Sequence, residues 1–216
     1  MFKNSLILLL FITQSCVVIG QDQKAKAILD DVTKTTKVYK TIVAEYNLTI
    51  LDKNKKQTER TSWKIRLKSG KFKLENSNNT IVCDGKTMWT YQRDSQKVTI
   101  TNYEPKTEKG IDITNILTFY ENGFKCKYEK EMKLGGKTLA VIDLFPSVKN
   151  ENPAYNKIKV HVDKIKKQMM YIVAQMTNGT TQSYELKNFI SDTELANELF
   201  VFNLKGFSPN QIVDKR

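Results

Sequence analysis

The sequence predicts a mainly β protein (α+β) whose strands form one large, curled antiparallel sheet. Most of the chain after residue 40 alternates apolar and polar residues with a period of two, the spacing of half-buried strands. Short stretches rich in Gly, Asn and Asp separate the alternating segments and favour tight hairpin connections. The pattern amounts to about ten strands, and a sheet of that size curls or closes on itself.

The first twenty residues are expected to be a secretory signal peptide, which leaves residues 21–216 as a single domain. Lys3 is the only charge in this stretch, and an apolar core at residues 5–12 follows it. That core is shorter than the ~18–20 apolar residues of a membrane-spanning helix. Gly20 is small and precedes a polar run, so cleavage is predicted between Gly20 and Gln21. A buried N-terminal strand is the alternative interpretation.

Cys16 lies where a bacterial lipoprotein signal would carry its lipidated cysteine. Such signals usually place leucine three residues earlier, where this chain has Thr13. They continue with polar residues, where this chain has Val17 and Val18. The sequence therefore favours an exported protein without a lipid anchor over a lipidated one.

The segment 22–39 is predicted to be an amphipathic helix, because its apolar residues recur every three or four positions. The apolar stripe consists of Ala25, Ile28, Leu29 and Val32.

The predicted strands follow one another as an up-and-down meander, interrupted once between residues 110 and 123. A last short strand at 200–204 is expected to close the sheet. The other predicted strands cover 41–51, 61–68, 71–75, 80–83, 87–91, 98–100, 124–132, 138–146, 156–163, 168–176 and 181–189.

Two short helices are expected to cover part of the sheet. The first spans 110–123, with Ile113, Ile116, Leu117 and Tyr120 on its apolar face. The second spans 191–200, where Ser191 and Glu194 have the spacing of a capping box.

The net charge of +12 does not point to nucleic acid. The lysines are scattered over the polar sides of the predicted strands, and no recognition helix, zinc finger or RNA-binding motif is present. A solvated outer face is the preferred explanation, and weak attraction to an anionic membrane surface is the alternative.

The sequence carries no pattern that supports catalysis, a metal or a cofactor. His161 is the single histidine and is expected at the surface, so His-based metal sites and the usual base of a Ser or Cys nucleophile are unsupported. No nucleotide-binding or nucleophile-elbow glycine motif occurs. Cys83 and Cys126 are expected to be buried, either as a disulfide or as two thiols.

The apolar side of the predicted strands is larger than the helices can cover. If the strands are in phase, one concave surface carries all of these side chains, and either they pack solid or a ligand cavity remains. They are Ile42, Tyr46, Leu48, Ile50, Trp63, Ile65, Leu67, Phe72, Leu74, Ile81, Trp89 and Tyr91.

The order of these elements resembles the outer-membrane lipoprotein carrier protein family, LolA. The hairpin "DGKTMWTY" at 84–91 is similar to a family motif of the form SDGKTLWxY. The run "YELKN" at 184–188, followed by "FVF" at 200–202, is similar to the family's closing segment. The resemblance covers nearly all of residues 22–214.

The resemblance implies an incomplete antiparallel β-barrel with a helical lid and no catalytic role. It implies a periplasmic chaperone, expected to be a monomer, that binds the acyl chains of lipoproteins. The partners implied are an inner-membrane lipoprotein-releasing transporter and an outer-membrane acceptor or the membrane itself. The alternatives are a membrane-anchored acceptor of the same fold, lipidated at Cys16, and a periplasmic interaction or signalling module with a filled core.

The expected acyl-chain site has two sides, and its lid latch is unassigned. Family members carry an Arg-Pro pair after the tryptophan-bearing strand, where this chain has Lys68, with Arg66 two residues earlier. The lid side is expected to be Ile28, Leu29, Val32, Ile116, Leu117 and Tyr120. The wall is expected to be Tyr46, Leu48, Trp63, Ile65, Phe72, Leu74, Trp89 and Tyr91.

Overall fold

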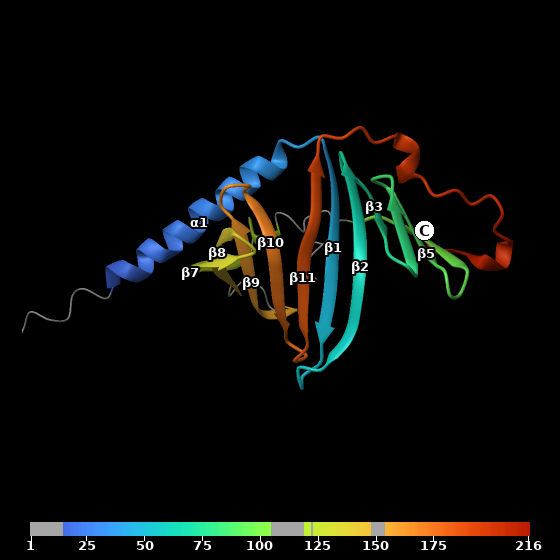
Figure 1. Cartoon of the computed structure of the whole chain (residues 1–216). Helices are drawn as coiled ribbons and strands as arrows, with labels where there is room; N and C mark the ends of the chain where they lie inside the picture. The colour runs from blue at the N-terminus through green and yellow to red at the C-terminus, as the bar shows by residue number, and fades with distance from the viewer. Residues whose placement is uncertain (1–14, 105–118, 122, 148–153) are drawn as a thin grey trace, which may run out of the picture.

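The computed structural model describes residues 15–104, 119–121, 123–147 and 154–216, which form one 12-stranded sheet and one long helix (Figure 1). The strand order is β12-β6-β5-β4-β3-β2-β1-β11-β10-β9-β8-β7. All neighbours are antiparallel except β12 and β6, which are parallel. Among the described strands β7 and β12 end this order and are not paired with each other, so the predicted incomplete antiparallel barrel is confirmed.

The strands are β1 (Thr41–Leu51), β2 (Gln57–Lys68), β3 (Lys71–Glu75), β4 (Asn79–Cys83), β5 (Thr87–Gln92), β6 (Lys97–Asn102), β7 (Phe124–Leu134), β8 (Lys137–Pro146), β9 (Tyr155–Asp163), β10 (Gln168–Met176), β11 (Thr181–Ser191) and β12 (Ile212–Asp214). The helices are α1 (Ser15–Lys37) and the one-turn 3-10 helices η2 (Phe119–Glu121), η3 (Asn197–Phe200) and η4 (Pro209–Gln211).

Helix α1 packs its apolar stripe against one part of the sheet. Ala25, Leu29 and Val32 are buried in the main hydrophobic cluster, and Ile28 packs against it half-buried. The predicted amphipathic helix is therefore confirmed. It extends further toward the N-terminus than expected, since the described helix Ser15–Lys37 continues across the predicted cleavage position between Gly20 and Gln21.

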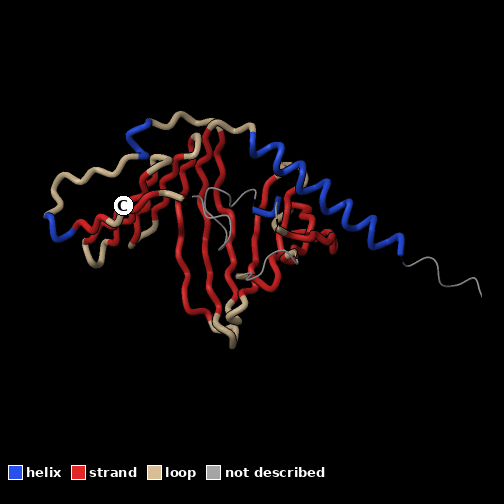
Figure 2. Tube along the Cα trace, turned by 180° about the vertical axis from the view of Figure 1, so that it is seen from behind, coloured by secondary structure: helices blue, strands red, loops and turns tan. Residues whose placement is uncertain are grey.

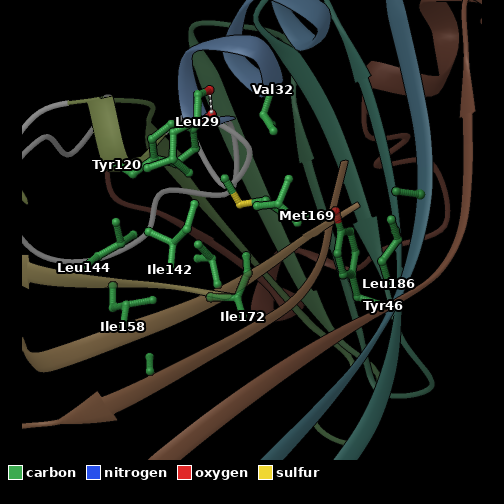
Figure 3. Packing of buried hydrophobic residues seen from close by; sticks show 14 of the residues in the cluster. Leu29, Val32, Tyr46, Tyr120, Ile142, Leu144, Ile158, Met169, Ile172 and Leu186 are labelled. Atoms are coloured by element: carbon green, nitrogen blue, oxygen red, sulfur yellow. Dashed lines mark hydrogen bonds between the residues drawn. The ribbon is translucent and has the colours of Figure 1, made fainter. Parts of the chain in front are cut away.

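The strand pairings define two faces of the sheet, because residues directly opposite each other point to the same side. We call the side against which α1 packs the inner face and the opposite side the outer face. Tyr46 pairs with Trp63 and with Leu186, and Ile142 pairs with Val160, so the inner face runs across both halves of the sheet. Its buried side chains form one continuous cluster (Figure 3).

Trp89 and Tyr91 lie on the outer face, so the prediction that they share a side with Phe72 and Leu74 is wrong. Cys83 pairs with Met88 across a turn of four residues, and an even number of turn residues pairs odd-numbered positions with even-numbered ones. Phe72 pairs with Cys83, and this places Met88 on the inner face and Trp89 outside. Asp84 fixes the turn by accepting hydrogen bonds from the amides of Lys86 and Thr87.

The chain after β11 covers this outer face. Trp89, Val82, Val98 and Ile100 form a second buried cluster. The side chains packed against it from the C-terminal segment are Phe202, Leu204, Phe207 and Ile212. The outer-face tryptophan is therefore covered by the protein's own chain.

Two predictions about the C-terminal segment are wrong. Residues 200–204 form no strand, and instead β12 adds to the sheet edge at 212–214. The predicted helix 191–200 is reduced to the single turn η3, because Ser191 still belongs to β11. Figure 2 shows this segment as loops and short helices that lie on the far side of the molecule from α1.

Candidate ligand-binding site

The inner face is the candidate site, and the structure places six of the eight predicted wall residues on it. Tyr46, Ile65, Phe72 and Leu74 are buried in the main cluster. Leu48 lies on the same face of β1, two residues beyond Tyr46, and Trp63 lies opposite Tyr46. Leu48 and Trp63 are half-buried. Trp89 and Tyr91 lie outside the site.

The inner face is covered unevenly along β1. Ile42, Ala44 and Tyr46 are all buried, whereas Leu48 and Ile50 retain partial exposure. Tyr184, opposite Leu48 on β11, is also half-buried. One end of the inner face therefore presents apolar side chains that the described part of the chain does not fully cover.

Tyr120 attaches η2 to α1 through two hydrogen bonds, of which Figure 3 shows the one to Leu29. Its hydroxyl donates to the backbone oxygen of Leu29 at 3.1 Å. With its single proton used there, the hydroxyl accepts from Thr33 Oγ1 at 2.8 Å. Burial raises the pKa of Tyr120 to about 12, so the proton stays in place at neutral pH. Beside it, Lys37 Nζ lies 2.7 Å from a Glu121 carboxylate oxygen.

The lid side is therefore partly located. Leu29, Val32 and Tyr120 are buried together in the main cluster, and Ile28 packs against it. Ile116 and Leu117 lie outside the described residues. The outer edge of α1 is held by exposed polar contacts, such as Lys24 Nζ at 3.8 Å from the ring centre of Tyr128. Contacts of this kind contribute little to stability, so the helix is bound mainly through its apolar stripe.

Neither candidate for the lid latch reaches α1 through a contact of the described residues. Lys68 Nζ donates to the backbone oxygen of Leu195 at 2.5 Å and so binds the C-terminal segment. Arg66 forms an ion pair with Glu75 on the neighbouring strand β3. The contacts that join α1 to η2 come instead from Tyr120 and Glu121, which sequence reasoning did not assign as a latch.

Within the described part of the chain, the inner-face hydroxyl groups of Tyr46 and Thr101 are buried without a hydrogen-bond partner. Tyr46 is the more buried, with 4% of its surface exposed. A buried hydroxyl with no partner costs about 1–3 kcal/mol. Tyr184, on the same face, donates to Gln182 Oε1 at 3.0 Å and so avoids that cost.

The other side chains that sequence analysis considered for chemistry are the acidic residues, His161 and the two cysteines in the described part of the chain. No group of three His, Cys, Asp or Glu side chains there is placed to hold a metal ion. His161 points to the outer face as expected, but it is half-buried against Tyr171, and neither ring nitrogen has a hydrogen-bond partner in the described ranges. Cys126 is a half-buried thiol that is not joined to Cys83. Within the described residues, no helix has the length and apolar character required to cross a membrane.

The fold and the site together define a class, an open antiparallel barrel whose apolar inner face is partly covered by a helix. Residues 37–203 match the model of the family described as outer membrane lipoprotein carrier protein LolA. The chain belongs to this family.

Solved structures share the fold at low sequence identity. An uncharacterised conserved protein from Thermus thermophilus is 13% identical with a TM-score of 0.59, the match covering 89% of this chain and all of the other. The lipoprotein LppX of Mycobacterium tuberculosis is 8% identical with a TM-score of 0.51, covering 81% of this chain and all of the other.

An uncharacterised protein of Methanocaldococcus jannaschii is 30% identical over 151 residues, or 68% of this chain. The chain spans only 42% of that relative's length.

Proposed function

We propose that the protein is a periplasmic carrier that binds the acyl chains of lipoproteins on its inner face, beneath α1. The observation that supports this is the half-buried apolar end of the inner face, where Trp63 and Tyr184 pack against the buried core. Leu48 and Ile50 lie on the same face of β1 and are also half-buried. Each CH₂ group of an acyl chain removed from water contributes about 0.8 kcal/mol. An apolar surface of this kind can therefore hold chains that would not cross an aqueous compartment alone.

Transport also requires that the cargo be released. We call α1 and η2 the cover of the site. The cover is held by the apolar stripe of α1, two hydrogen bonds to Tyr120 and exposed ion pairs, with no covalent link among the described residues. Such contacts can be exchanged for contacts with cargo at moderate cost. We infer that the protein takes lipoproteins from a releasing transporter of the inner membrane and delivers them to an acceptor at the outer membrane. Family membership supports this role.

Native mass spectrometry with a triacylated lipopeptide tests binding directly. We expect a one-to-one complex with a monomeric protein. Leu48→Glu places a charge on the half-open inner face and should lower the occupancy about tenfold or more, because a carboxylate is costly to bury. Ile190→Glu is the matched control: Ile190 lies opposite Val43 on the outer face and is 49% exposed. Absence of any complex, or equal loss in both variants, argues for an interaction module with a filled core.

A membrane-anchored acceptor is the second candidate, favoured by one observation. Helix α1 contains both Cys16 and Gln21 and runs between them without interruption. A lipid on Cys16 would join such a helix directly to a membrane. The mass of the mature N-terminal peptide separates the two roles, since a chain beginning at Gln21 supports the carrier and an acylated Cys16 supports the acceptor.

A further inference from the structure

The Tyr46 hydroxyl is a polar group inside an apolar surface, and the described part of the chain offers it no hydrogen-bond partner. Its side chain is 4% exposed, and its oxygen has no hydrogen-bond partner among the described residues. Two other tyrosines differ, since Tyr120 on η2 forms hydrogen bonds with Thr33 and Leu29, and Tyr184 on the inner face forms one with Gln182. Buried hydroxyls are nearly always satisfied in native proteins, so an exception calls for a physical reason.

The position of Tyr46 suggests that reason. Along the inner face of β1, Tyr46 is the last buried residue before Leu48 and Ile50, which are half-buried. It lies between Trp63 on β2 and Leu186 on β11. Figure 3 shows its ring beside Leu186 with the hydroxyl directed toward the interior beneath α1. A ligand that enters along the half-open end would pass this hydroxyl where the covered interior begins.

The chemistry of the Tyr46 hydroxyl defines which ligand group it would bind. Burial raises the pKa of Tyr46 well above its usual value, so the hydroxyl stays protonated and can donate. An acceptor that enters an apolar interior must be cheap to remove from water. An ester or amide carbonyl oxygen meets this requirement, whereas a carboxylate would lose far more hydration energy.

We infer that the Tyr46 hydroxyl donates a hydrogen bond to a carbonyl oxygen of the bound lipid, at the point where its acyl chain joins the ester or amide. The inference rests on the proposed acyl-chain binding. It adds a fixed point, because the hydrogen bond would set where the lipid carbonyl lies along the inner face. The protein should then distinguish acyl esters from hydrocarbon chains that lack the carbonyl.

The test compares two diacylglycerol-type lipids of equal chain length, one ester-linked and one ether-linked. The wild-type protein should bind the ester about tenfold more tightly than the ether, as expected for one buried hydrogen bond. Tyr46→Phe should lose that preference by weakening ester binding alone. Tyr171→Phe is the control: it removes an outer-face hydroxyl that donates to Glu185 at 3.1 Å, and it should keep the preference.

Two further readouts do not depend on affinity. The infrared carbonyl stretch of a ¹³C-labelled ester should shift to lower wavenumber when bound to wild-type protein and not to Tyr46→Phe. The ligand-free Tyr46→Phe protein should melt at an equal or higher temperature than wild type, because the change removes an unsatisfied group.

The outcomes separate this inference from the proposed function. Equal binding of both lipids by the wild type, or an ester preference that persists in Tyr46→Phe, overturns the role of Tyr46 and leaves the carrier function standing. A clear drop in the melting temperature of ligand-free Tyr46→Phe also overturns it, since the hydroxyl would then have a structural partner. No binding of either lipid by the wild type overturns both.

Discussion

The Tyr120 hydroxyl donates a hydrogen bond to the backbone oxygen of Leu29, which lies 91 residues earlier in the chain. The same hydroxyl accepts from Thr33, one turn further along α1. Together with the ion pair between Lys37 and Glu121, these contacts hold the C-terminal half of α1 to η2. They make Tyr120 the principal polar attachment of the cover among the described residues.

Removing this attachment should loosen the cover. Tyr120→Phe keeps the ring in the core and removes both hydrogen bonds, so we expect unfolding free energy to fall by about 1–2 kcal/mol. Amide hydrogen exchange in α1 should rise more than exchange in β9 and β10. Thr33→Ser is the control, because it keeps the hydroxyl that donates to Tyr120. Unchanged exchange in α1 would show that apolar packing alone holds the helix.

The two tryptophans should report on opposite faces of the sheet. Trp63 is half-buried on the inner face, and Trp89 lies in the outer-face cluster. If lipid binds on the inner face, adding it to Trp89→Phe protein should shift the emission of Trp63 to shorter wavelength, because the indole loses water contact. The emission of Trp89 in Trp63→Phe protein should not change. A response from Trp89 would place the ligand elsewhere.

Lys68 should matter for the C-terminal segment and not for the cover. Lys68→Met removes the hydrogen bond to the Leu195 carbonyl and should cost about 1 kcal/mol of stability. Lipid uptake and release rates should stay within about twofold of wild type. If lipid uptake or release rates change in Lys68→Met but not in Arg66→Met, Lys68 acts as the lid latch in a conformation different from the one described here.

His161 should make the protein less stable in mild acid. Burial, followed by the charge of Lys159, lowers the pKa of His161 below its ordinary value of 6.5. The opposing charges around it are Asp143 and Glu129, and Lys130 adds to the lowering. The folded state therefore binds fewer protons than the unfolded state, and stability falls as the pH drops through the unfolded pKa toward the folded one.

Urea unfolding of wild type and His161→Phe across about pH 5 to 8 measures this effect. Below about pH 6.5, the unfolding free energy should fall with decreasing pH more steeply in wild type than in the variant. The difference in slope corresponds to at most one proton, about 1.4 kcal/mol per pH unit. Phenylalanine can keep the contact with the Tyr171 ring, whose centre lies 5.8 Å from that of His161. Identical slopes would show that the imidazole gains water or a partner when it is protonated.

Most of the strands could be predicted from the sequence because alternation is a local signal. The predicted strands 41–51 and 71–75 agree with β1 and β3 residue for residue. β2 begins at Gln57, four residues before the predicted start. Its first residues are polar and exposed, and they pair with the end of β1 beyond the core. Local pattern therefore identified the elements better than their limits.

The relation between strands is where sequence reasoning failed. Which side Trp89 faces depends on the number of residues in the turn before it, and alternation within one strand carries no information about the next. The alternation of Phe200 and Phe202 is typical of a strand, yet Phe200 is fully buried at the end of η3 and Phe202 packs on the outer-face cluster. That Tyr46 has no hydrogen-bond partner among the residues described here is a property of the packed interior and has no signature along the chain.

The separate edges β7 and β12 have a mechanical consequence. Among the described strands no backbone ladder joins them, so the seam between these edges can widen while every inter-strand hydrogen bond stays intact. A closed β-barrel would have to break a row of such hydrogen bonds to hold a larger ligand. If acyl chains bind on the inner face as proposed, this sheet could adjust its width by bending, and one scaffold would then hold ligands with different numbers of acyl chains.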